Sequence, residues 1–127
     1  MTSRDLPPGP YAVGIGLRAG VEAAIIAAAV RECLGDLKIA CLATVDRRAD
    51  EPGLVGAAQL LGVPVVVFPA DQLAQVAVPN PSARTAEALG TPSVAEAAAL
   101  LASQGGELAV PKTVISGITL AAALIRD

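Results

Sequence analysis

The chain has 127 residues, with 12 acidic and nine basic side chains and a formal net charge of −3 at pH 7. This charge and a 2% share of aromatic residues argue against nucleic-acid binding, because phosphates attract cations and bases stack on rings. Histidine is absent, which excludes Ser-His and Cys-His catalysis and most zinc sites. We therefore expect no metal and no cofactor, and any catalysis would use carboxylates, lysine, arginine, hydroxyls or backbone groups.

Residues 1–10 are polar and rich in proline, and we expect them to form a flexible lead. Residues 11–127 are then one domain, because a chain of this length supports a single hydrophobic core. The lead has no apolar segment of the kind found in signal peptides. The longest uncharged helical run, Ala23 to Val30, is far shorter than the ~20 residues of a membrane span. We therefore predict a soluble, cytoplasmic protein without a membrane segment.

Hydrophobic residues make up 54% of the chain and are mainly alanine, valine, leucine and isoleucine. This composition is typical of parallel strands that alanine-rich helices cover on both faces. We predict an α/β protein, a three-layer α/β/α sandwich around a mostly parallel sheet of about five strands. A hairpin over residues 108–120 would give the sheet an antiparallel edge. Cys33 and Cys41 are expected to be reduced, buried and apolar in their packing.

Hydrophobic periodicity and turn residues predict the elements in chain order. The first half alternates strands with helices, which indicates right-handed βαβ units and a parallel sheet. The predicted strands are 11–15, 38–45 and 65–68, and the predicted helices are 21–34, 52–61 and a short turn at 72–74. In the second half we predict helices over 82–89 and from Ser93 to 103, a strand over 108–110 and a final strand from 116 with a helical end.

The turn after the first predicted strand carries a glycine pattern. Gly14, Gly16 and Ala19 satisfy the loose dinucleotide motif G-x-G-x-x-G/A. The acid that would bind a ribose, Asp46, lies 32 residues after Gly14 instead of the usual ~20. The alternatives are a plain turn between strand and helix, and an anion site formed by Arg18 and the helix N-terminus.

Charged residues gather directly after the second predicted strand. Five of the six residues from Asp46 to Glu51 are charged. Ligands of open α/β sheets bind beyond the carboxyl ends of the strands, which makes Thr44 and Asp46 candidates for a site. A charge run of this kind is also typical of a solvated loop.

A second polar cluster precedes the last predicted helix. Ser93, with Glu96 three residues later, has the pattern of a helix capping box. The alternative is that Thr91, Ser93 and the first N–H groups of that helix line a ligand pocket.

Four motifs follow one another along the chain. They are Gly14-Ile15-Gly16-x-Arg18-x-Gly20, Ala43-Thr44-Val45-Asp46-x-Arg48-x-x-Glu51-x-Gly53, Gly90-Thr91-Pro92-Ser93-Val94-Ala95-Glu96-Ala97-Ala98 and the segment from Lys112 to Leu120. In this order the chain resembles CobE and the C-terminal domain of CbiG, proteins of cobalamin biosynthesis. That family usually has Cys where this chain has Leu17, which excludes a thiol mechanism there. It usually has Lys where this chain has Arg48, which keeps the positive charge.

The resemblance implies a place in the construction of the corrin ring. CbiG proteins open the lactone of cobalt-precorrin-5A and release acetaldehyde, and they carry an additional N-terminal region that this chain lacks. CobE-like proteins are a stand-alone form associated with the aerobic pathway. We therefore expect a cobalamin biosynthesis protein that binds or processes a corrin intermediate of the precorrin or hydrogenobyrinic-acid type. The alternatives are CbiG-type lactone hydrolysis, and non-enzymatic binding of another anionic ligand such as a nucleotide.

A corrin intermediate carries acetate and propionate groups around an apolar macrocycle, so its site needs cations at the rim of an apolar cleft. Arg18, Arg48 and Lys112 follow predicted strands and would supply them. For hydrolysis, Asp46 or Glu51 would activate water, and Lys112 or Arg18 would stabilise the oxyanion. The expected ligand-binding residues are Gly14, Gly16, Arg18, Gly20, Thr44, Arg48, Gly90, Thr91, Ser93, Glu96 and Thr119. The expected partners are a corrinoid or tetrapyrrole intermediate and other cobalamin-pathway enzymes, and self-association is left open.

Overall fold

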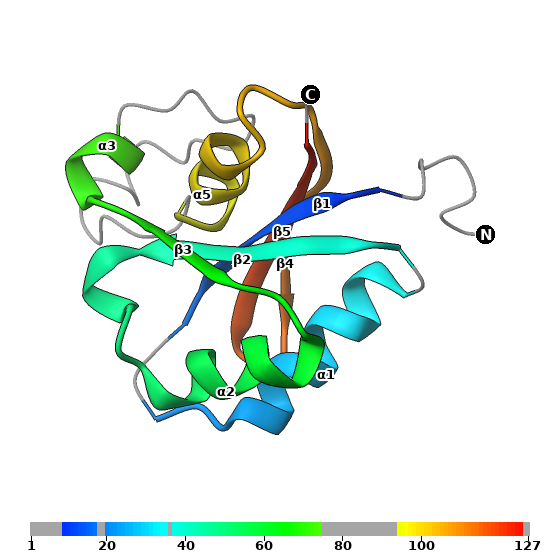
Figure 1. The fold of residues 1–127 in the computed structure, drawn as a ribbon, viewed down its shortest axis with the longest axis vertical. Coiled ribbons are helices and arrows are strands. Elements are labelled where there is room, and N and C mark those ends of the chain that lie inside the picture. The colour runs from blue at the N-terminus through cyan, green and yellow to red at the C-terminus, as the bar shows by residue number, and fades with distance from the viewer. Residues whose placement is uncertain (1–8, 18–19, 36, 75–93, 126–127) are drawn as a thin grey trace.

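The computed structural model describes residues 9–17, 20–35, 37–74 and 94–125. These residues form three layers, with one sheet between two layers of helices (Figure 1). The α/β sandwich predicted from the sequence is confirmed. Because helices cover both faces of the sheet, its central strands are buried on both sides, which explains the high share of small aliphatic residues.

The sheet consists of three parallel strands and an antiparallel hairpin. β1 (Tyr11–Gly16), β2 (Ile39–Val45) and β3 (Val65–Phe68) run in the same direction. β4 (Leu108–Ile115) and β5 (Ile118–Leu124) form the hairpin, and β5 pairs with β1 in the antiparallel direction. The strand order is β3-β2-β1-β5-β4, which places β1 at the centre. The predicted antiparallel edge is therefore confirmed.

In the described part of the chain, two helices lie on each face of the sheet. α1 (Ala23–Leu34) and α2 (Pro52–Leu61) cover one face, and α3 (Ala70–Ala74) and α5 (Val94–Ala102) cover the other (Figure 1). A short 3-10 helix, η2 (Asp46–Arg48), follows β2 directly. None of the helices in the described part of the chain has the length and apolarity that a membrane crossing requires.

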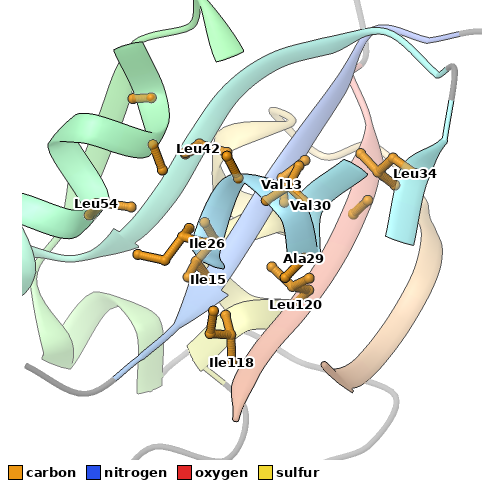
Figure 2. Packing of buried hydrophobic residues seen from close by; sticks show 14 of the residues in the cluster. Val13, Ile15, Ile26, Ala29, Val30, Leu34, Leu42, Leu54, Ile118 and Leu120 are labelled. Atoms are coloured by element: carbon orange, nitrogen blue, oxygen red, sulfur yellow. The ribbon is translucent and has the colours of Figure 1, made fainter. Parts of the chain in front are cut away.

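The larger core lies between the sheet and the layer of α1 and α2 (Figure 2). Alternate residues of each strand point toward these helices, as the two-residue period of a strand dictates. Burial of a large aliphatic side chain contributes about 1.5–3 kcal/mol, so this layer is a main source of stability. Its members that are at most 1% exposed include Tyr11, Val13, Ile15, Ile26, Val30, Leu42, Leu54, Ile118 and Leu120.

The opposite face of the sheet is lined by small residues where α5 crosses it. Gly14 lies in β1 beneath α5, and a Cβ atom at this position would overlap the main chain of Ala95 and crowd that of Ala99. Ala121 and Ala123 of β5 pack in the same cluster. Because glycine and alanine leave so little bulk between them, the helix and the sheet approach closely.

The structure corrects the interpretation of Gly14 as part of a glycine turn. β1 continues through Gly16, and Gly14 pairs in register with Ala43 on one side and Ala121 on the other. A dinucleotide-binding turn needs its first glycine at the end of the strand, where the chain turns toward the phosphates. Gly14 instead serves the packing of α5, so the dinucleotide motif is not formed in the expected way.

The end of the chain also differs from its prediction. The strand expected at 108–110 continues past Pro111 to Ile115, and the alanine-rich tail forms β5 without a helical end. α5 begins one residue after the predicted cap and ends at Ala102, close to the predicted end. The helix expected over 82–89 and the cap at Ser93 lie outside the described residues.

Three buried or half-buried groups have pKa values that burial raises. Cys41 in β2 is buried, Cys33 in α1 is half-buried, and both are free thiols. Burial raises the pKa of each thiol above its ordinary value of 9.0, and the nearby carboxylate of Glu32 adds to the rise at Cys33. Burial also raises the pKa of Tyr11 above its ordinary value of 10.0.

We therefore expect the free energy of unfolding to fall as the pH rises above 9.0, the ordinary thiol pKa. In this range the unfolded chain has lost protons that the folded chain still holds, so the linkage term favours unfolding. Urea denaturation at neutral and alkaline pH measures the effect. A Cys33→Ala, Cys41→Ala double variant should show a smaller fall, and an equal fall in both proteins would contradict the assignment to the thiols.

Candidate functional site

The carboxyl ends of the three parallel strands lie along one edge of the sheet. The turn between β4 and β5 lies at the same edge, because Gly16 at the end of β1 pairs with Thr119 near the start of β5. We call this the carboxyl edge. Ligands of open α/β sheets bind beyond such an edge, so it is the first place to search for a site.

Three residues form a row across the sheet at the carboxyl edge. Thr119 pairs with Gly16 on one side and with Val114 on the other, and directly paired antiparallel residues share a face. This is the face of α5, because Ala121, two residues after Thr119, packs against that helix. Val114 is 65% exposed, while Gly16 and Thr119 are half-buried. We call these three residues the edge row.

Gly16 is a glycine that the described fold does not require. Its φ lies outside the left-handed region, and among described residues an added Cβ would meet only the Cβ of Thr119, at 3.6 Å. That distance is an ordinary contact. At Gly14 and Gly53, by contrast, a Cβ would overlap main-chain atoms. A strand glycine that packing does not demand often marks a position where a ligand approaches the backbone.

Thr44 lies inside the molecule and not on the surface of the carboxyl edge. Its side chain is 1% exposed, and its hydroxyl donates a 2.7 Å hydrogen bond to the main-chain oxygen of Ile15 on the neighbouring strand. A buried hydroxyl that is bonded in this way ties β2 to β1 near their carboxyl ends. The structure therefore gives Thr44 a structural role in holding β2 against β1.

The charged run after β2 forms η2 and leads into α2. Asp46 and Arg47 are exposed and Arg48 is half-buried. The N–H of Ala49 donates to the carbonyl of Asp46 at 3.0 Å, which closes the 3-10 turn. The prediction that charge directly follows the second strand is confirmed. Asp46 and Arg48 thus bring a carboxylate and a guanidinium to the carboxyl edge.

Glu51 connects two loops at the carboxyl edge. Its Oε2 accepts a 2.8 Å hydrogen bond from the main-chain N–H of Gly20, 31 residues earlier in the chain. Gly20 has a φ of +89°, which glycine adopts without the strain that a side chain would cause. Two expected site residues are therefore bonded to one another, a contact that no sequence motif indicates.

Glu96 and Lys112 are also brought together, by a hydrogen bond between α5 and β4. Glu96 lies in the first turn of α5 with 0% exposure, and its Oε2 accepts the main-chain N–H of Lys112 at 2.9 Å. Lys112 lies inside β4, three residues before the strand ends at Ile115. The expectation that Lys112 follows the end of a strand is wrong, because β4 continues past it to Ile115. The bond instead anchors α5 to the edge strand β4.

The remaining expected site residues are Arg18, Gly90, Thr91 and Ser93, all of which lie outside the described residues. The structure adds Val114, which could not be found from the sequence because the predicted strand ended at residue 110. Within residues 9–17, 20–35, 37–74 and 94–125, no group of three or more His, Cys, Asp or Glu side chains could hold a metal ion.

The sequence matches the family described as Cobalamin synthesis G C-terminus over residues 11–123. This span contains the whole carboxyl edge and nearly all of the sheet. The chain therefore belongs to that family, which is the CobE/CbiG family indicated by its sequence motifs. It is a cobalamin biosynthesis protein.

Two solved structures share both the fold and part of the sequence. CobE, a protein from the cobalamin (vitamin B12) biosynthetic pathway, is 34% identical with a TM-score of 0.77, and the match covers 93% of this chain and 96% of CobE. The cobalamin biosynthesis protein chiG from Agrobacterium tumefaciens str. C58 is also 34% identical, with a TM-score of 0.70 and coverage of 92% and 99%. These proteins match this chain over almost their whole length.

A curated relative is much longer. The cobalt-precorrin-5A hydrolase of Priestia megaterium is 28% identical over 123 residues, a match that covers 93% of this chain and 33% of the hydrolase. This chain therefore spans about a third of the length of that relative.

Proposed function

We propose that this protein binds a corrinoid intermediate of cobalamin biosynthesis at the carboxyl edge, against the edge row. The main support for the proposal is that the described fold does not need glycine at position 16, where among the described residues an added Cβ would meet only Thr119. Membership of a cobalamin biosynthesis family supports a ligand from that pathway. The ligand would approach from the face of α5, since α1 and α2 close the opposite face.

The edge row suits a corrinoid in shape and polarity. A corrinoid is a broad apolar macrocycle with carboxylates around its rim, and a bare strand allows such a plane to lie close to the sheet. The exposed side chain of Val114 offers apolar surface, and burial of apolar surface contributes about 25 cal/mol per Å². Arg48 follows β2 at the same edge, and its guanidinium can form charge-assisted bonds to rim carboxylates.

The helix dipole of α5 adds to this complementarity. α5 begins at Val94, which belongs to the same buried cluster as Val45, the last residue of β2. The N-terminus of the helix therefore faces the carboxyl edge, and its partial positive charge favours anionic groups. A carboxylate at the rim of the macrocycle would be stabilised there.

The experiment is a visible-absorbance titration of the purified protein with corrin intermediates. Gly16→Leu fills the space over the edge row and should raise the Kd at least about tenfold, equivalent to about 1.4 kcal/mol. Ala28→Leu places the same side chain on the exposed surface of α1 and should leave the Kd unchanged. Equal Kd values for the two variants would show that the ligand does not bind at the edge row. Absence of binding by the unmodified protein would overturn the proposed function.

A second function, hydrolysis of the lactone of cobalt-precorrin-5A, is supported by the relative that bears the name of that activity. Asp46 is exposed directly after β2 and is the carboxylate we propose as the base that activates water. An acetaldehyde assay on the titrated samples tests this function. Asp46→Asn should abolish release and the neighbouring Asp50→Asn should not, whereas equal release by both variants would exclude Asp46 as the base.

A further inference from the structure

Glu51 occupies a junction between three segments of the carboxyl edge. Its backbone is extended at the start of α2, with φ −64° and ψ 117°. Its main-chain N–H donates to the carbonyl of Arg48 at 3.0 Å, and its own carbonyl accepts the N–H of Val55 at 3.0 Å. The main chain of Glu51 therefore joins the end of η2 to the first turn of α2.

The side chain of Glu51 extends away from the helix that it precedes. Residues at this position commonly use a side-chain oxygen to cap their own helix, but Glu51 makes no such bond. Its Oε2 instead accepts the N–H of Gly20 in the segment that follows β1. A charge-assisted bond from an amide to a carboxylate is stronger than a neutral one, so this contact is well suited to hold a loop.

Two further contacts hold the same pair of segments together. A Cβ at Gly53 would overlap the carbonyl of Val21, which shows that α2 starts directly against the chain that enters α1. A Cβ at Gly56 would crowd the Cβ of Ala23 one turn later. The hydrogen bond of Glu51 is therefore the outermost of three contacts and the one nearest to the loop that follows Gly16.

We propose that Glu51 is a positioning residue for the ligand site and not its catalytic base. Glu51 holds the segment at Gly20 against the segment that carries Arg48. It therefore sets the distance between these two segments at the carboxyl edge. What this role requires is an acceptor oxygen, which a glutamine amide also supplies, although in a weaker neutral bond. A base, in contrast, must be able to take up a proton.

The closing experiment separates these roles with Glu51→Gln, Glu51→Ala and the neighbouring control Asp50→Ala. Hydrogen exchange at the Gly20 amide reports the bond itself and needs no ligand. We expect exchange to accelerate in Glu51→Ala and to stay slow in Glu51→Gln and Asp50→Ala. Thermal denaturation of each variant shows whether the fold is retained.

Ligand binding supplies the second measurement, and this part of the inference rests on the proposed corrinoid function. We expect Glu51→Ala to raise the Kd for the corrin intermediate about 2- to 10-fold, the range of one hydrogen bond, while Glu51→Gln stays near the unmodified protein. Acetaldehyde release should follow the same order if the protein hydrolyses the lactone. Loss of turnover in Glu51→Gln with a slow Gly20 amide would overturn the assignment in favour of a base.

Different measurements test corrinoid binding and the positioning role of Glu51. If the unmodified protein binds no corrinoid, the proposed function is wrong, but exchange at Gly20 still decides whether Glu51 holds the loop. If exchange at Gly20 is equally fast in the unmodified protein and in Glu51→Ala, the positioning role is wrong even where corrinoid binding is observed.

Discussion

Replacement of Gly14 by alanine is expected to lower the free energy of unfolding by about 3 kcal/mol or more, at the upper end of overpacking effects. The added methyl group would overlap the carbonyl of Ala95 and press on the main-chain nitrogen of Ala99, and neither atom can rotate away. α5 would have to move off the sheet to make room. For a domain of this size the midpoint of thermal unfolding should fall by about 10 °C, as measured by calorimetry.

Gly16→Ala is the matched control for this prediction. Gly16 lies two residues along the same strand and on the same face, but a Cβ there meets only an ordinary contact with Thr119 among the described residues. We expect its stability to stay close to that of the unmodified protein. If Gly14→Ala and Gly16→Ala unfold at the same temperature, the close packing of α5 against β1 is wrong.

Removal of the buried carboxylate of Glu96 is expected to have the second large effect. Glu96→Ala leaves the main-chain N–H of Lys112 without its 2.9 Å acceptor and opens a cavity at a position with 0% exposure. Loss of a buried acceptor and loss of side-chain volume each destabilise, so we expect a total of about 2–4 kcal/mol in urea denaturation.

Two variants test the cause of that loss. Glu96→Gln keeps an oxygen that can accept the N–H of Lys112 and should destabilise less than Glu96→Ala. Glu107→Ala removes an exposed glutamate and should change stability by less than about 0.5 kcal/mol. Equal midpoints for Glu96→Ala and Glu107→Ala would contradict the structural role of Glu96.

Gly14 and Glu96 both hold α5 in place, and the position of α5 also affects the proposed ligand site. The helix packs against Gly14, and Glu96 links it to β4 through a hydrogen bond. Its N-terminus lies beside the carboxyl edge. A variant that shifts α5 should therefore weaken ligand binding as well as stability. Gly16→Leu should have a different effect, because it should weaken ligand binding while the packing of α5 against Gly14 is unchanged.

β4 shows why one strand could not be predicted to its full length. The predicted strand over residues 108–110 ends directly before Pro111, and proline has no N–H for a sheet. Among the described strands, β4 lies at the edge and pairs only with β5, and its register is irregular between Val110 and Thr113. An edge strand tolerates proline because its outer side needs no partner. Strand order, which local sequence does not contain, decided this point.

The alanine-rich tail could not be predicted correctly from helix propensity. Alanine favours helices, so a helical end was expected after the last strand. Ala121 and Ala123 instead lie in β5 and pack against Ala95 and Ala99 of α5. Small side chains at these positions permit the close approach of helix and sheet, and this tertiary requirement overrides the local preference.

The sequence alone determined the α/β class, the parallel strands β1 to β3, the helices between them and the charge that follows β2, because periodicity, turn residues and charge clusters are local signals. The tertiary structure decided the use of individual site residues. Thr44 is bonded to Ile15, Glu51 to Gly20 and Glu96 to Lys112, each pair at least 16 residues apart. Which polar group a side chain reaches depends on how strands and helices are stacked, and no local pattern records that arrangement.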